Sequence, residues 1–253
     1  MKNPKEPLKI SFSTQKGGVG KSTFTTIISS LLHYRLGYNV LVVDCDFPQY
    51  SLSGIRERDL KIIMKNDYQK KIAMKQFQAI NKKAYPIIKC RPDEAMQTAS
   101  EYIKNMVVLP DFVFFDLPGT ANTKGVLTTL KAMDYIFAPI TADRVVVESA
   151  LSFAKAFLQL PGGPVNESNF WLFWNQVDGR EKTDLYETYE KVIAELDLSI
   201  METRVTDSKR FRKEGDSSHS YIFRSSLLAA DSRLMKLTRI DQYILEFLKI
   251  IRL

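Results

Sequence analysis

The chain has 253 residues, 45% of them hydrophobic, and a formal net charge of +7 from 36 Lys and Arg against 29 Asp and Glu. This length can bury one substantial core, and no Pro-, Gly- or Ser-rich linker divides it, so we expect a single domain over residues 1–253. Two cysteines, Cys45 and Cys90, exclude a disulfide scaffold and match no metal-binding pattern. With no signal peptide and no apolar run long enough to span a bilayer, the sequence predicts a soluble cytoplasmic protein.

The first motif is a glycine-rich loop between an expected strand at residues 8–12 and an expected helix that ends near Gly37. Residues 16–23 have the sequence KGGVGKST. Glycines allow backbone N–H groups to surround a polyphosphate at the positive end of a helix. In such loops the lysine, here Lys21, reaches the β- and γ-phosphates, and the hydroxyl of Ser22 can bind Mg²⁺. The loop therefore predicts a nucleotide site, although Gln15 stands where the general pattern G-x-x-x-x-G-K-[ST] has its first glycine.

Two later strands are expected to end in carboxylates. A strand at residues 39–43 leads into Asp44 and Asp46, and the bulky apolar run at residues 112–115 leads into Asp116. Ligands of open α/β sheets bind at the carboxyl ends of the strands. A carboxylate buried there is costly unless a cation or hydrogen bonds meet it. A Mg²⁺-bound water is a natural partner for Asp116.

Further strands are expected at residues 135–140 and 170–174, and further helices at residues 145–160 and 182–196. This alternation predicts an α/β fold with a mostly parallel twisted sheet and helices on both faces. Asp143 is a candidate N-cap of the first of these helices. Asn175 ends the last strand, where its amide can bind a purine edge or simply form a turn.

The positive charge is concentrated in two regions. Residues 56–91 contain eleven basic and three acidic residues, a net charge of +8, and fall within a segment, 51–105, for which we expect basic amphipathic helices. The apolar side chains at helical spacing there are Tyr68, Ile72, Ala73, Phe77, Ile80 and Ala84. The second region is Lys209, Arg210, Arg212 and Lys213, followed by Arg224. Either region can bind DNA phosphates, and either can be a solvated helix face.

The loop with its second lysine, Lys16, resembles the deviant Walker A loop of the ParA/MinD family of ATPases, and the resemblance covers nearly the whole chain. It implies the P-loop NTPase fold, ATP and Mg²⁺ as cofactors, and Lys16 and Asp46 as catalytic residues. The family has D-x-D-P-Q where this chain has one more residue, Phe47, so Asp44 is the alternative to Asp46. The family usually has Pro where Thr206 stands. The resemblance implies nucleotide contacts from Lys16, Gly17, Gly18, Val19, Gly20, Lys21, Ser22, Thr23, Asn175 and Thr206, and a metal site of Ser22, Asp46 and Asp116.

In that family two subunits enclose two ATP molecules, and the first loop lysine reaches the partner's phosphates. The resemblance thus implies an ATP-dependent homodimer that binds DNA without sequence preference, acts in DNA partition and is stimulated by a ParB-like protein. The resemblance favours Lys209, Arg210, Arg212, Lys213 and Arg224 as the DNA-binding residues. It also implies that the ATP-bound protein lies on the nucleoid. The alternative is a MinD-like positioning ATPase that binds membranes through the amphipathic stretch at residues 240–251, but we expect this helix to pack on the sheet, which does not favour a membrane partner. A metabolic ligase of the same fold is a third hypothesis, without a substrate motif to support it.

Overall fold

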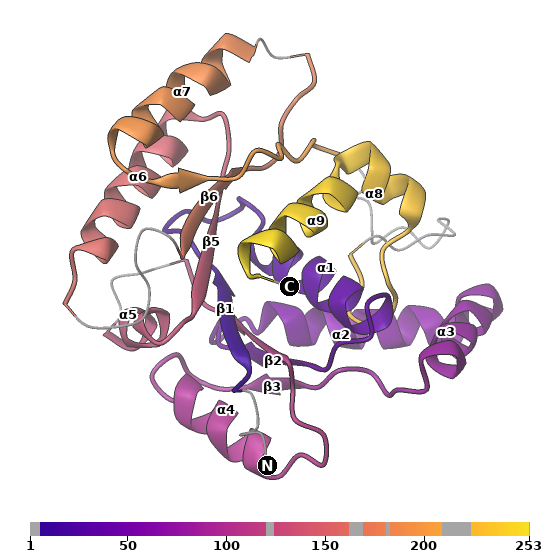
Figure 1. Cartoon of the computed structure of the whole chain (residues 1–253). Helices are drawn as coiled ribbons and strands as arrows, with labels where there is room; N and C mark the ends of the chain where they lie inside the picture. The colour runs from indigo at the N-terminus through magenta and orange to yellow at the C-terminus, as the bar shows by residue number, and fades with distance from the viewer. Residues whose placement is uncertain (1–5, 120–123, 162–168, 181–182, 209–223, 253) are drawn as a thin grey trace.

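The computed structural model describes residues 6–119, 124–161, 169–180, 183–208 and 224–252. In this part of the chain, seven strands form one sheet in the order β3-β2-β4-β1-β5-β6-β7, and every neighbouring pair is parallel (Figure 1). The strands are β1 Leu8–Phe12, β2 Val40–Asp44, β3 Ile87–Lys89, β4 Phe112–Asp116, β5 Tyr135–Ile140, β6 Phe170–Trp174 and β7 Ser199–Ile200. The predicted α/β fold with a parallel sheet is confirmed.

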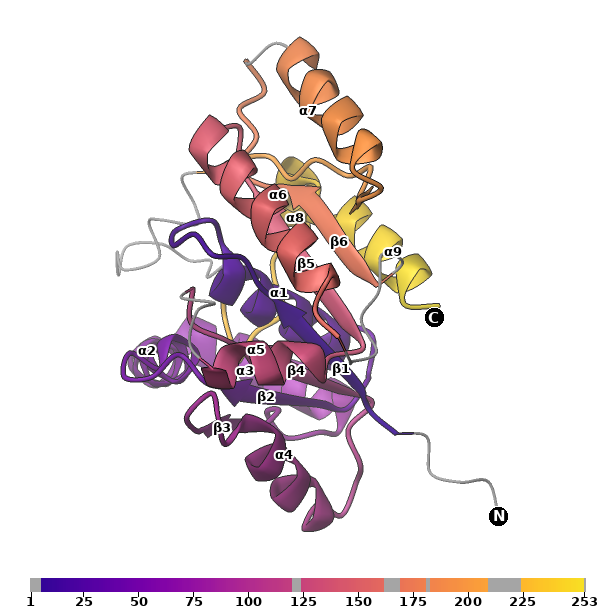
Figure 2. The same cartoon turned by 90° about the vertical axis from the view of Figure 1, so that its left-hand side faces the viewer.

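Helices cover both faces of the sheet, as Figures 1 and 2 show from two directions. The helices whose apolar side chains join the core on one face are α4 Ala95–Lys104, α5 Lys124–Lys131, α6 Arg144–Leu158 and α7 Thr183–Glu195. Those on the other face are α1 Lys21–Tyr34, α2 Ser51–Lys65, α8 Ser232–Thr238 and α9 Ile240–Ile250. The helix α3, Asp67–Ile80, packs beside α2 and against residues 227 and 228.

An aromatic cluster fixes the position of β1 in the core. The ring of Phe12 lies with its centroid 5.7 to 6.4 Å from those of five other aromatic side chains. These come from α1, β4, β5, β6 and α9, and are Phe24, Phe114, Phe137, Phe173 and Phe247. Aromatic pairs in such arrangements stabilise a core beyond their buried area. The loop between β1 and α1 is therefore anchored at both ends by buried rings.

The segment at residues 51–105 departs most from the sequence-based expectation. It contains the expected helices α2 and α3, but also the strand β3 and the helix α4, which the apolar pattern did not predict. The predicted buried face of α3 is wrong at Tyr68, which is 52% exposed, whereas Gln69 is buried. The reason is that the carboxyl-terminal part of α3 packs against α1, where the centroid of the Phe77 ring lies 5.7 Å from that of Tyr34, whereas near its amino end only the side around Gln69 and Ala73 is covered.

The carboxyl-terminal helix α9 packs on the sheet. Ile240, Tyr243 and Phe247 are fully buried and belong to the same core as Phe12. The prediction of a packed terminal helix is confirmed, and the apolar face that a bilayer would need is covered by protein. Among the described residues, the helices are all too short or too polar to cross a membrane.

Candidate functional site

The glycine-rich loop connects β1 to the first turn of α1 at the carboxyl edge of the sheet. Gly18 and Gly20 have φ values of 77° and 105°, in the left-handed region that favours glycine. A Cβ atom on Gly20 would lie 2.6 Å from the amide nitrogen of Asn175, so this position also requires a residue without a side chain. The helix starts with the bond from the Phe24 N–H to the Gly20 carbonyl, 2.9 Å long. Its first N–H groups are left to bind an anion.

Two side chains after β6 hold the loop in place. The amide of Asn175 donates to the Val19 carbonyl at 2.8 Å, and the amide of Gln176 donates to the Gly18 carbonyl at 2.9 Å. These bonds occupy loop carbonyls and leave loop N–H groups available. The sequence singled out Asn175 for adenine, but gave no signal for Gln176, because its contact to the loop spans 158 positions of the sequence.

Lys21 lies between the loop and the end of β4. Its ammonium group donates to the Lys16 carbonyl at 2.9 Å, and a Cβ on Gly119 would lie 3.0 Å from its Nζ atom. Burial lowers the pKa of Lys21, and the nearby carboxylates of Asp116 and Asp46 oppose that shift. The turn that follows β4 thus touches the lysine that is expected to bind phosphate.

The two carboxylates after β2 have different surroundings. Asp44 is buried, and its Oδ2 accepts bonds from the N–H and the hydroxyl of Ser53 at 2.8 and 2.9 Å. Burial raises the pKa of Asp44 despite these bonds. Asp46 lines the cavity above the loop and accepts a 2.9 Å bond from the Ser51 hydroxyl. This geometry favours Asp46 over Asp44 as the carboxylate that faces a ligand.

Asp116 has a buried oxygen that no donor satisfies. Its side chain is fully buried, its Oδ1 accepts a long 3.4 Å bond from the Thr25 hydroxyl, and its Oδ2 has no hydrogen-bond partner in the described part of the chain. Burial raises the pKa of Asp116 to about 7, the Asp44 and Asp46 carboxylates act in the same direction, and a side-chain hydrogen bond with Ser22 opposes the shift. An unsatisfied carboxylate oxygen fits a water molecule in the shell of a cation.

The residues predicted to hold Mg²⁺ fit that ion only together with a nucleotide. Among the described residues, no group of three or more His, Cys, Asp or Glu side chains is arranged to hold a metal. Mg²⁺ keeps several waters and takes the rest of its ligands from one or two protein oxygens and substrate phosphates. The Ser22 hydroxyl, Asp46 and Asp116 suit that mode.

A cavity of about 870 Å³ lies over the loop. Its lining residues are Gln15, Gly17, Gly18, Gly20, Lys21, Ser22, Thr23, Asp46, Phe47, Gln49, Ser51, Gly54, Ile55, Arg58, Leu117, Pro118, Gly119 and Arg224. A second cavity of about 250 Å³ shares Gly18, Gly20, Thr23 and Arg224 with it and is also lined by Phe24, Asn175, Gln176 and Asp207. The larger volume is in the usual range of small-molecule sites.

Some predicted site residues lie elsewhere. Thr206 does not line either cavity, and its N–H donates to the Thr238 carbonyl at 3.2 Å, whereas its neighbour Asp207 lines the smaller one. Arg224, predicted for DNA, lines both cavities. The remaining predicted DNA residues, Lys209, Arg210, Arg212 and Lys213, lie outside the described residues.

The fold and the loop define a P-loop nucleotide-binding protein: a parallel sheet whose first strand enters a glycine-rich loop, a lysine and the N-terminus of a helix. The sequence profile of the CobQ/CobB/MinD/ParA nucleotide binding domain matches residues 10–219. The chain belongs to this family. The comparison with curated protein sequences gave no match.

Three solved structures have a similar fold. A Borrelia burgdorferi B31 plasmid partition protein bound to AMPPNP has a TM-score of 0.57 and 19% identity, over 87% of this chain and 95% of that one. The MinC:MinD cell division complex of Aquifex aeolicus has a TM-score of 0.54 and 17% identity, over 81% of this chain and 84% of that one. The pNOB8 ParA protein bound to nonspecific DNA has a TM-score of 0.50 and 21% identity, over 78% and 80%. At these identities the likeness concerns the fold.

Proposed function

We propose that this protein is an ATP-dependent switch that forms a dimer around two ATP molecules, binds DNA without sequence preference and acts in DNA partition. Hydrolysis of ATP to ADP and phosphate returns it to the monomer. The observation that carries the proposal is a cavity lined by the glycine-rich loop, Lys21 and Asp46, with the buried carboxylate of Asp116 close enough to Lys21 to act on its pKa. A nucleotide analogue in one similar structure and nonspecific DNA in another support it.

In this mechanism the loop N–H groups and Lys21 hold the phosphates, and Asn175 faces the base side. Mg²⁺, held by the Ser22 hydroxyl with Asp46 and Asp116 beside it, would offset negative charge on the phosphates. Asp46 orients the attacking water from the open side of the cavity. The ammonium group of Lys21 contacts the Lys16 carbonyl and lies beside Gly119. A phosphate bound by Lys21 would therefore also lie near the start of the loop and the turn after β4.

Lys16 completes the partner's site in this proposal. Its side chain is only partly buried at the mouth of the loop, where a second subunit can approach. A lysine supplied in trans places positive charge where the transferred phosphoryl group accumulates negative charge, as an arginine finger does. The site is then complete only in the dimer, which makes ATP the switch for assembly and doubles the basic surface offered to DNA.

Lys16→Gln tests this arrangement. The variant should bind ATP nearly as tightly as the wild type, because Lys21 and the loop N–H groups remain, but should neither dimerise nor hydrolyse ATP. Light scattering with AMPPNP measures the dimer, and phosphate release measures hydrolysis. Lys83→Gln, an exposed lysine far from the loop in sequence, is the matched control. A normal nucleotide-dependent dimer of Lys16→Gln would remove Lys16 from the mechanism.

DNA binding is proposed to rest on phosphate contacts. The exposed lysines of α2 and α3 are Lys61, Lys65, Lys70, Lys71 and Lys75. They compete for this role with the cluster at residues 209–213, which the family resemblance favours.

A ParB-like protein is the proposed stimulating partner. The rival function, a MinD-like membrane switch, has less support because α9 is packed on the sheet. Co-sedimentation of the AMPPNP state with anionic liposomes, and not with DNA, would establish the rival.

A further inference from the structure

We propose that Arg224 is a nucleotide-binding residue, which adds to the loop a cation from a distant part of the chain. This inference rests on the proposed function, because it concerns the same nucleotide. Arg224 lies 201 positions after Thr23 in the sequence, yet its Nη1 donates to the Thr23 hydroxyl at 3.1 Å. It lines both the cavity over the loop and the smaller cavity beside Asn175, so its guanidinium group lies where phosphate and base sides of a nucleotide would meet.

The electrostatic setting of Arg224 favours an anion. The amino end of α1 carries the positive end of the helix dipole, and Lys21 is already there. The helix dipole and the ammonium group of Lys21 together give this end of the cavity a positive potential that attracts an anion. Among the described residues that line the large cavity, Lys21, Arg58 and Arg224 are cations and Asp46 is a carboxylate, and Arg58 is also paired with Asp59 outside the lining. A polyphosphate is the chemical class that satisfies this balance, and the planar fork of arginine suits phosphate oxygens.

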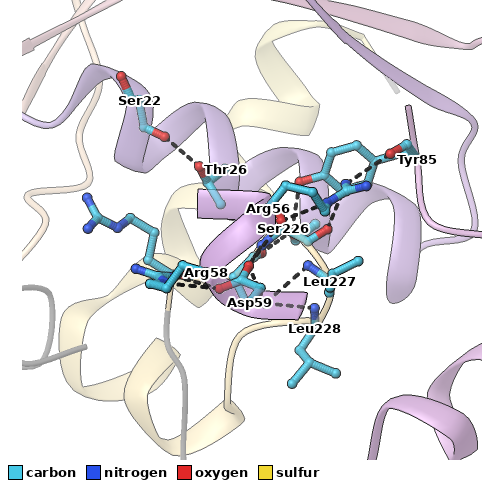
Figure 3. Close-up of polar contacts among 12 residues, drawn as sticks. Ser22, Thr26, Arg56, Arg58, Asp59, Tyr85, Ser226, Leu227 and Leu228 are labelled. Carbon is cyan, nitrogen blue, oxygen red and sulfur yellow. Dashed lines mark hydrogen bonds and ion pairs between the residues drawn. The ribbon is translucent and has the colours of Figure 1, made fainter. Parts of the chain in front are cut away.

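A buried network holds the chain immediately after Arg224. Asp59 on α2 has no exposed surface, and its Oδ2 accepts bonds from the Ser225 hydroxyl at 3.0 Å and from the N–H and hydroxyl of Ser226 at 2.7 and 3.0 Å. Figure 3 shows Asp59 between Arg58 and the chain that carries Ser226, Leu227 and Leu228. The backbone of Arg224 is therefore fixed before any ligand binds.

Two arginines of α2, Arg56 and Arg58, also hydrogen-bond the segment at residues 224–226. Arg58 bonds the Asp59 carboxylate at 2.7 Å and the Arg224 carbonyl at 2.6 Å. Arg56 bonds the Ser226 hydroxyl at 2.9 Å and also the Tyr85 carbonyl at 3.0 Å, but lines neither cavity. Such preorganisation reduces the entropy cost of binding, which is the arrangement expected of a ligand-binding arginine.

The experiment compares Arg224→Gln with Arg56→Gln in the full chain. Both variants lose a guanidinium group from one network, but only Arg224 faces the cavities. Calorimetry with Mg²⁺ and either AMPPNP or ADP should show that Arg224→Gln lowers the affinity for both nucleotides by about tenfold or more, as expected for loss of a charge-assisted bond. Arg56→Gln should stay within about twofold of the wild type, although it lowers the unfolding temperature. Arg224→Lys should fall between wild type and Arg224→Gln, because it keeps the charge without the fork.

Two results would overturn the inference. The first is an Arg224→Gln affinity within twofold of the wild type, or an Arg56→Gln loss of equal size, which would make Arg224 a structural tether. The second is unchanged nucleotide affinity with weaker DNA binding at saturating AMPPNP, which would return Arg224 to the DNA surface. If Arg224→Gln does not fold, Arg224→Lys against Arg56→Lys decides by the same criteria. A wild-type protein that binds neither nucleotide would overturn the proposed function as well, whereas tight wild-type binding that Arg224→Gln leaves intact would overturn this inference alone.

Discussion

Asp59 on α2 and Asp116 at the end of β4 are both fully buried carboxylates, and their surroundings differ. Asp59 accepts bonds from Arg58, Ser225 and Ser226, all shorter than 3.3 Å. Asp116 has a long bond from Thr25, an interaction with the Ser22 side chain, and an oxygen without a partner in the described part of the chain. The protein fully satisfies Asp59, which therefore serves the fold, whereas the unsatisfied oxygen of Asp116 lies beside the loop lysine Lys21, where a ligand is expected.

The largest effect is expected at Asp59. Asp59→Ala leaves the Arg58 guanidinium and three donors without their acceptor, and should lower the free energy of unfolding by about 3 to 5 kcal/mol, the cost of breaking a buried ion pair. Urea denaturation followed by circular dichroism measures it. Asp67→Ala, at an exposed position in the first turn of α3, is the control and should cost less than about 1 kcal/mol. Equal losses at Asp59 and Asp67 would mean that the Asp59 network is not a structural element.

Lys21 is the counterpart of Asp59, because its substitution should affect nucleotide affinity rather than stability. Lys21→Ala should lower ATP affinity by about 100-fold or more, since the ammonium group supplies charge-assisted bonds to phosphates. The unfolding temperature of this variant should change little, because the only hydrogen bond of the Lys21 ammonium group within the described part of the chain goes to the Lys16 carbonyl. Calorimetry and thermal unfolding measure the two quantities on one preparation. Near-wild-type affinity would contradict the phosphate-binding role of the loop.

Asp116→Asn should change the free energy of unfolding by less than Asp59→Ala does. The change should also be of opposite sign, a gain rather than a loss. The folded protein holds the Asp116 proton up to pH about 7, whereas the unfolded chain releases it near the ordinary pKa of 3.8. Without Mg²⁺ or nucleotide, this carboxyl group therefore costs stability that grows as the pH rises from about 4 to about 7. Asp116→Asn should be more stable than the wild type at pH 8 by on the order of 1 to 3 kcal/mol, and the gain should shrink at pH 5.

Thermal unfolding in EDTA at the two pH values checks this expectation. Asp59→Asn, the matched buried control, should be less stable than the wild type at both. A gain for Asp116→Asn that does not depend on pH would show that ionisation of Asp116 is not its source.

The sequence predicted those features that depend on neighbours along the chain. The loop around Lys21, the apolar strand before Asp116 and the helical spacing of α1 are local patterns, and they predicted the parallel α/β fold and the sheet edge where the site is proposed to lie. The pattern could not give Gln176 or the position of Arg224 in the cavity, because their partners are 158 and 201 residues away. The pattern gave no sign that Asp59, in the basic segment at residues 56–91, is buried, because its partners Ser225 and Ser226 lie more than 160 positions later in the sequence.

The most direct test of the proposed switch is DNA binding by the wild-type protein with Mg²⁺ and AMPPNP, with ADP and without nucleotide. Fluorescence anisotropy with two unrelated duplexes should show tight binding to both in the AMPPNP state and weak binding in the other two. The logarithm of the affinity should fall linearly with the logarithm of salt concentration, with a slope of roughly 0.9 per phosphate neutralised. Equal DNA affinity in all three states, or strong preference for one duplex, would contradict the account.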